Sequence, residues 1–174
     1  MAKLFVPMLK LLVVMALLAL AFSSTAQTPV LPATDVSAGD IKAFINALPP
    51  NAVSDKAIRT VDVGGWRVGV YGVLRPKSIH QEANVHQTRV TEIYYILEGS
   101  GTLVTGGTLP DPKPLAGSAT TLQSSRIDGG VSRRVSPGDV VIIPGRTPHW
   151  FSSQDGDLKY VIFRPDPDGK LALK

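Results

Sequence analysis

The stretch that decides the fold is residues 85–104, which read VHQTRVTEIYYILEGSGTLV. Residues 92–97 are rich in β-branched and aromatic side chains. They are followed by the Gly-Ser-Gly sequence at residues 99–101 and then by a second run of β-forming residues. Strand, glycine-containing turn and strand in this order predict a β-hairpin.

Both faces of the first predicted strand are mostly apolar. Because side chains alternate across a strand, Glu92 shares one face with Tyr94, and Tyr95 shares the opposite face with Leu97. Both faces therefore need cover. Glu92 is the polar exception, and an isolated ionised carboxylate is costly to bury. We therefore expect Glu92 to have a partner.

These residues resemble the first sequence motif of the cupin superfamily. In that motif a His-x-His pair is followed, after three or four intervening residues, by Glu and then, after six more intervening residues, by Gly. His86, Glu92 and Gly99 match the motif in register, whereas Thr88 stands where the second histidine is usual.

The second cupin motif is matched by residues 138–149, GDVVIIPGRTPH, which end at His149. Arg146 replaces the usual glycine, and Ser153 stands where asparagine is frequent. The resemblance implies an all-β fold, a double-stranded β-helix jelly roll (cupin barrel), here with a short N-terminal helix. It implies no particular reaction, because the superfamily includes isomerases, dioxygenases, lyases, storage proteins and binding modules.

The strand pattern independently predicts an all-β barrel or sandwich. From residue 59 onward the hydrophobic period is two, and glycine, proline and aspartate separate the runs. No helical period intervenes, so parallel βαβ units are not expected. The predicted strands are residues 60–63, 66–74, 91–97, 102–105, 131–135, 140–143, 149–152 and 159–163.

Residues 1–26 have the pattern of a signal peptide. Lys3 and Lys10 precede the apolar stretch at residues 11–22, and small residues follow at 24–26. Cleavage before Gln27 would give an exported protein, periplasmic or extracellular, with no stable membrane anchor. The alternative is an uncleaved anchor. The sequence contains no cysteine, which excludes disulfides and a lipid-modified cysteine.

Cleavage would leave a chain of one-domain size whose charge is nearly balanced. The net charge of the whole sequence is +4, and two of its 18 basic residues lie in the predicted signal. Charged residues make up only 18% of the chain and form no basic cluster, so a nucleic-acid partner is not expected. We predict an N-terminal extension at residues 27–58 and a cupin barrel at residues 59–168.

The predicted extension contains one short amphipathic helix. Ser37 stands three residues before Asp40, as at a helix N-terminus, and Pro49 and Pro50 end the pattern. The apolar residues follow an i, i+3, i+4, i+7 spacing at Ile41, Phe44, Ile45 and Leu48. This face would cover the outer sheet surface at Tyr95 and Leu97, or else a subunit interface.

Residues 106–130 form a long connection rich in glycine and proline. Such a connection inside a compact domain is a lid, a binding loop or an insertion. The sequence leaves these alternatives open, and a short strand at residues 120–124 is compatible with the pattern.

The resemblance places His86, Glu92 and His149 in the barrel interior as the candidate metal ligands. Two imidazoles and one carboxylate suit iron, manganese, nickel or zinc and leave positions open for water and substrate. The alternative is a metal-free cupin whose pocket histidines are simply hydrogen-bonded. We expect the third histidine, His80, to be a solvated loop residue.

Three further residues are candidates for binding a substrate. Tyr94 shares the face of Glu92 and would present a hydroxyl, or else fill the core. Arg133 would hold a carboxylate or phosphate if it points inward, or else lies on the surface. Phe151 shares a face with His149.

The sequence therefore supports two functional hypotheses without deciding whether the protein is catalytic. In the first, the protein is an exported single-domain cupin that binds a small molecule, with or without a divalent metal in the barrel. In the second, it is a metal-dependent enzyme of the dioxygenase, isomerase or lyase type that acts on a small oxygenated substrate. A homodimer is expected in either case, because one short helix does not cover an apolar sheet face.

Overall fold

The structure is a computed structural model that describes residues 30–174. The predicted signal peptide, residues 1–26, lies outside the described residues. The chain divides into two units, Met1–Pro32 and Ala33–Lys174, and the described helix and strands belong to the second. Within residues 30–174 no helix is both long and apolar enough to cross a membrane.

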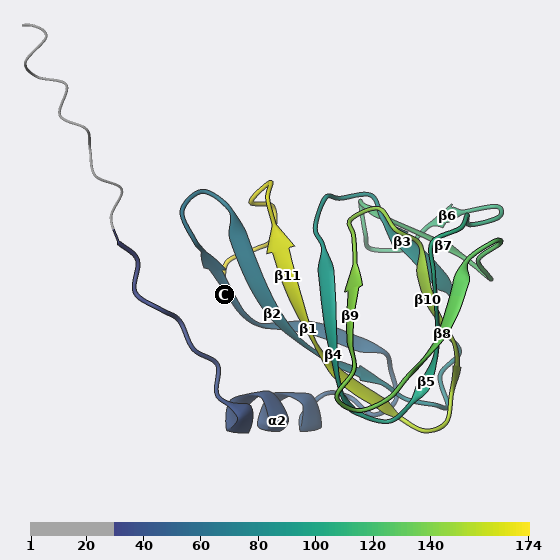
Figure 1. The fold of residues 1–174 in the computed structure, drawn as a ribbon, viewed down its shortest axis with the longest axis horizontal. Coiled ribbons are helices and arrows are strands. Elements are labelled where there is room, and N and C mark those ends of the chain that lie inside the picture. The colour runs from purple at the N-terminus through teal and green to yellow at the C-terminus, as the bar shows by residue number, and fades with distance from the viewer. Residues whose placement is uncertain (1–29) are drawn as a thin grey trace, which may run out of the picture. The chain divides into compact units, whose positions relative to one another are not determined.

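Eleven strands in the described part of the chain form two antiparallel sheets (Figure 1). The first sheet has five strands in the order β1-β2-β11-β4-β9. Their bounds are β1 Ser54–Asp62, β2 Arg67–Arg75, β11 Leu158–Asp166, β4 Glu92–Glu98 and β9 Val140–Ile143.

The second sheet has six strands in the order β6-β7-β3-β10-β5-β8. Their bounds are β6 Lys113–Pro114, β7 Thr121–Ser124, β3 Ala83–His86, β10 His149–Gln154, β5 Gly101–Thr105 and β8 Val131–Val135. Sequential strands alternate between the two sheets at several points, as a jelly roll requires. The predicted all-β architecture is confirmed.

The core lies between the two sheets and is built from the inward residues of both. Burial alternates along β4 as the sequence predicted, with Glu92, Tyr94 and Ile96 buried. Tyr95 lies on the opposite face, which was expected to be covered, and is exposed. The largest core cluster contains Val73, Tyr94, Ile96, Leu103, Val135, Val141, Ile143, Phe151, Leu158, Tyr160 and Ile162.

The hairpin predicted from residues 92–105 corresponds to β4 and β5, but the two strands belong to different sheets. Gly99 adopts a φ of 79°, a left-handed conformation that favours glycine. β4 pairs with β11 and β9, and β5 pairs with β10 and β8. The turn therefore carries the chain from one sheet to the other instead of closing a two-stranded hairpin.

The helix α2, Ala38–Asn46, begins as predicted, with the side chain of Ser37 accepting a hydrogen bond from the backbone N–H of Asp40 at 3.1 Å. It packs on β2 of the five-stranded sheet. A Cβ at Gly72 would lie 2.9 Å from both Phe44 and Ile45, so the close approach of helix and sheet requires glycine there. Tyr95 remains 41% exposed, so the helix covers only part of this face.

Several strands extend beyond their predicted limits. β1 begins at Ser54, so the first strand starts inside the predicted extension of residues 27–58. At the other end, the backbone N–H of Lys174 donates to the carbonyl of Thr60 at 3.1 Å, past the predicted barrel limit at residue 168. The connection at residues 106–130 contains two short strands, β6 and β7, and β7 pairs with β3.

Candidate metal centre

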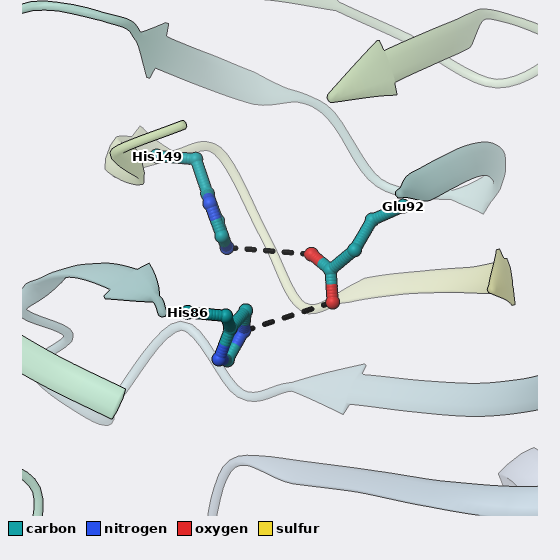
Figure 2. A group of neighbouring side chains, drawn as sticks. All are labelled: His86, Glu92 and His149. Atoms are coloured by element: carbon teal, nitrogen blue, oxygen red, sulfur yellow. Dashed lines mark ion pairs between the residues drawn. The ribbon is translucent and has the colours of Figure 1, made fainter. Parts of the chain in front are cut away.

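Three strand termini bring the candidate ligands together. His86 is the last residue of β3, Glu92 the first of β4, and His149 the first of β10. Figure 2 shows both imidazoles pointing at the carboxylate of Glu92. One ligand atom from each residue lies within 4.8 Å of the other two.

His149 is oriented by its backbone neighbour. Its Nδ1 lies 3.0 Å from the carbonyl oxygen of Thr147, and a carbonyl can only accept, so Nδ1 carries the proton. In the neutral ring, Nε2 then holds a lone pair, and it lies 3.4 Å from Oε2 of Glu92. His149 is only 4% exposed, so little solvent reaches the space between Nε2 and the carboxylate of Glu92.

His86 is held by the connection that the sequence left undefined. Its Nδ1 lies 3.0 Å from the hydroxyl of Thr121 on β7, and its Nε2 lies 3.7 Å from Oε1 of Glu92. Burial lowers the pKa of His86 below its usual value, although the nearby Glu92 opposes the shift. The imidazole is thereby kept in the neutral form that binds metal.

Glu92 is a buried carboxylate with a cationic partner. Its side chain is 4% exposed, and the Nε of Arg164 donates to its Oε1 at 2.8 Å. The hydroxyl of Tyr94 donates to Oε2 at 3.0 Å. Burial alone would raise the pKa of Glu92, but Arg164, with His149 and His86, lowers it to about 2.

Arg164 also binds Asp55, and this network was not predicted from the sequence. Its Nη1 and Nη2 donate to the two carboxylate oxygens of Asp55 at 3.0 and 2.6 Å. The guanidinium lies over the ring of Tyr71 at 4.2 Å from its centroid. Asp55 lies on β1, Tyr71 on β2 and Arg164 on β11, so three neighbouring strands of one sheet fix the position of Glu92.

Two cavities adjoin the candidate ligands. The first has a volume of about 570 Å³ and is lined by all three ligands together with Tyr94, Arg75, Gln81, Asn84, Thr121 and Gln123, among others. The second has a volume of about 390 Å³ and is lined by His86 and Glu92 with Thr88 and Arg164. Thr88, at the position of the absent histidine, therefore faces the second cavity. His80 is exposed and lies on the lining of the first.

The three candidate substrate-binding residues lie in different places. Tyr94 is buried and lines the first cavity. Phe151 is part of the core cluster, stacked on Tyr94 with 6.4 Å between ring centroids. Arg133 is exposed on β8 and donates to the hydroxyl of Thr105 at 3.2 Å, outside the residues that line either cavity. The arginine that lines the first cavity is Arg75, which the sequence did not indicate.

The donor set fits a divalent transition metal. Two imidazole nitrogens and one carboxylate oxygen match the ligand types that iron, manganese, nickel and zinc accept. The backbone carbonyl of Thr147 and the hydroxyl of Thr121 supply the outer hydrogen bonds that usually orient ligating histidines. Thr88 lines the second cavity beside His86 and Glu92, and its neutral hydroxyl is a poor metal ligand.

The chain belongs to the cupin family. The family model described as "Cupin" matches residues 69–172, which include all three candidate ligands. The resemblance found in the two sequence motifs is thus confirmed, and the two sheets form the expected cupin barrel. None of the curated protein sequences matches the chain at a significant level.

The chain is similar to solved structures of three bacterial proteins. Protein BH2720 of Bacillus halodurans is 15% identical, with 80% of this chain and 86% of that one covered and a TM-score of 0.48. The DMSP lyase DddQ of Ruegeria pomeroyi is 18% identical, with coverages of 94% and 92% and a TM-score of 0.42. A cupin-like protein of Thermotoga maritima is 19% identical, with coverages of 66% and 68% and a TM-score of 0.42.

Proposed function

We propose that this protein is an exported cupin that binds a small oxygenated molecule at a divalent transition metal held by His86, Glu92 and His149. The observation that carries the proposal is the gap between His149 and Glu92. Nε2 of His149 and Oε2 of Glu92 lie 3.4 Å apart, and the proton of His149 is on the far nitrogen. Two lone-pair atoms facing each other in a buried site call for a cation between them.

A metal ion meets this need better than a proton does. A proton on Nε2 of His149 would bridge that nitrogen to Glu92 only. Nε2 of His86 faces the same carboxylate at 3.7 Å, and one ion among the three atoms satisfies all of them. Glu92 is held ionised by Arg164, so it is ready to act as a ligand.

The cavity supplies the place for the small molecule. A bound divalent ion would act as a Lewis acid on an oxygen of the ligand. Tyr94 keeps its proton, because burial and the adjacent Glu92 raise the pKa of its hydroxyl well above the usual value. Tyr94 therefore orients Glu92 as a hydrogen-bond donor and does not serve as a base.

The test is metal binding by the purified protein. Adding iron(II), manganese, nickel or zinc to chelator-treated protein should raise its melting temperature, because the metal binds the folded state. His149→Ala should abolish the rise. His80→Ala, which removes an exposed imidazole outside the ligand group, should keep it. If the wild type gains no stability with any of the four metals, the metal-free hypothesis replaces this one.

The enzyme hypothesis remains the second candidate, and one observation favours it. The cavity that contains the three ligands is also lined by groups able to exchange protons, namely Asp55, His80 and Glu82. Three protein ligands also leave positions for a substrate and for water or oxygen. Turnover of a small oxygenated compound that requires both metal and His149 would establish catalysis.

Export and dimerisation complete the proposal. Export rests on the basic, apolar and small-residue pattern of residues 1–26. Dimerisation rests on the outer face of the five-stranded sheet, where Tyr95, Val140, Ile142 and Phe163 are 41%, 60%, 64% and 38% exposed. β9 is an edge strand of this sheet, so a second copy of the chain could cover its apolar side chains.

A further inference from the structure

Arg75 places a positive charge inside the barrel. It lies on β2 at the same strand parity as Val73, a fully buried core residue, and so faces inward. Its guanidinium carbon lies 5.6 and 5.9 Å from the ring centroids of Phe151 and Tyr160. Arg75 and the three candidate metal ligands line the same cavity of about 570 Å³.

The guanidinium of Arg75 is held by neutral groups. Its Nε donates to the hydroxyl of Tyr160 at 2.6 Å, and its Nη1 donates to the side-chain oxygen of Gln81 at 2.6 Å. Within residues 30–174 it forms no ion pair, whereas Arg164 is paired with two carboxylates. A cation withdrawn from water without a counter-charge is costly unless an anion joins it.

Arg75 also has unused hydrogen-bond donors. A guanidinium has five N–H groups, and the bonds within residues 30–174 engage only the Nε and Nη1 atoms, so Nη2 is uncommitted. Nη1 and Nη2 of one guanidinium suit the two oxygens of a carboxylate. Tyr160 and Gln81 fix the plane of the guanidinium, which lowers the entropy lost when a ligand binds.

The cavity charge favours an anion once a metal is present. Asp55 and Glu92 share Arg164, and Glu82 is the other carboxylate on the lining. A divalent ion together with Arg75 and Arg164 would outnumber these negative charges. The lining also contains the neutral polar side chains of Gln81, Asn84 and Gln123, of which Gln81 bonds Arg75 directly.

From these contacts we infer that the ligand of this cavity is a small carboxylate, with its carboxylate group on Arg75 and a second oxygen at the metal centre. The inference rests on the proposed binding role of the cavity. The substrate class is then a small carboxylate, and Arg75 is the residue that selects it. Arg75 thereby takes the anion-binding role that Arg133 would have had if it pointed inward.

The experiment compares hydroxy-carboxylates with their neutral amides. Zinc-loaded and chelator-treated protein would be titrated calorimetrically with glycolate, glycolamide, 4-hydroxybutyrate and 4-hydroxybutyramide. The two chain lengths allow for different spans between arginine and metal. In the zinc-loaded wild type, at least one carboxylate should bind tenfold or more tightly than its amide. Arg75→Gln should reduce this preference below threefold and leave zinc affinity unchanged.

Two further variants separate a binding role from a folding role. Arg75→Lys retains the positive charge but loses the bidentate geometry of the guanidinium. Its preference for the carboxylate over the amide should therefore be intermediate. Arg133→Gln, at an exposed arginine outside the cavity, should bind as the wild type does. If Arg75→Gln does not fold, the comparison of Arg75→Lys with the wild type decides the matter.

The outcomes distinguish this inference from the metal proposal. Equal binding of acid and amide by the wild type, or an undiminished preference in Arg75→Gln, would overturn the inference. Tighter binding of inorganic phosphate than of any carboxylate would overturn it as well. If zinc does not bind but chelator-treated protein shows a carboxylate preference that depends on Arg75, the metal proposal fails and the placement of the second oxygen fails with it. The assignment of a carboxylate ligand to Arg75 then stands on its own.

Discussion

The Nε of Arg164 donates to Oε1 of Glu92 at 2.8 Å, so an arginine fixes the carboxylate that completes the candidate metal centre. The other oxygen of Glu92 faces Tyr94 at 3.0 Å and His149 at 3.4 Å. Each carboxylate oxygen therefore accepts a hydrogen bond from the protein and also faces one imidazole, Oε1 that of His86 and Oε2 that of His149. Glu92 remains ionised when buried because Arg164 supplies the compensating charge before any metal binds.

Arg164→Met should destabilise the protein strongly. The substitution leaves Glu92 and Asp55 without their cation, and removing one partner of a buried ion pair costs about 3–5 kcal/mol. Urea denaturation of chelator-treated protein would measure the loss. Arg89→Met breaks the exposed pair with Asp168 and should cost less than about 1 kcal/mol. Similar losses in the two variants would contradict the assigned role of Arg164.

Acid should destabilise the chelator-treated protein in a defined range. The pKa of Glu92 is lowered from 4.5 to about 2 in the folded state. A lowered carboxyl pKa stabilises the fold above the unfolded-state value, and that contribution is lost as the pH falls from about 4.5 to about 2. The loss should be on the order of 3 kcal/mol.

Glu92→Gln provides the control for the acid prediction. The variant has no carboxyl group to titrate at this position, so its stability should change less over the same pH range. The measurement is urea denaturation at a series of pH values for both proteins. Parallel pH dependence in wild type and variant would show that Glu92 is not the group responsible.

The sequence identified the strands well because alternation is a local property. In residues 92–97 the alternation of side chains alone separates the inward from the outward face. The structure places Tyr94 on the inward face and Tyr95 on the outward face, as expected. The candidate ligands His86 and His149 were identified from the residue spacing within the two cupin motifs. They meet because β3 and β10 are neighbours, paired through Asn84 and His149.

The two arginines of the site were missed for a physical reason. Each lies one position beyond a predicted strand end, Arg75 after Leu74 and Arg164 after Phe163. A charge next to a proline normally indicates the end of a strand. Here both strands continue, since β2 includes Arg75 and β11 extends to Asp166.

The partners of Arg164 are distant in sequence. Glu92 and Asp55 lie 72 and 109 positions away. Pairing at such separations is set by sheet order, which no local pattern encodes. Thr121 was missed for the same reason, since only the pairing of β3 with β7 brings it to His86.

The exported product should begin at or within a few residues of Gln27. The predicted cleavage follows the small residues at positions 24–26. Intact-mass measurement of protein recovered from the periplasm or medium would locate the first residue. Recovery of the full-length chain in the membrane fraction would instead support the uncleaved anchor.

The protein should be a homodimer that Ile142→Glu converts to a monomer. Ile142 is 64% exposed on edge strand β9, and a charge there would be buried without a partner in the interface. Light scattering at micromolar concentration would measure the mass of both proteins. Val131→Glu, at a 62% exposed valine on the other sheet, should leave the dimer intact. A monomeric wild type would show that α2 is the only cover this face has.

Thr88→His should tighten metal binding. Thr88 stands where the first cupin motif usually has its second histidine, and it lines the second cavity beside His86 and Glu92. An imidazole there would add a nitrogen donor, and we expect zinc affinity to rise by about tenfold or more, equivalent to at least about 1.4 kcal/mol. Thr88→Ala should leave the affinity nearly unchanged, because the hydroxyl is a poor ligand. Calorimetric titration of the three proteins with zinc makes the comparison, and equal affinities would mean that position 88 does not face the ion. That result, combined with loss of binding in His149→Ala, would confine the centre to the three residues His86, Glu92 and His149.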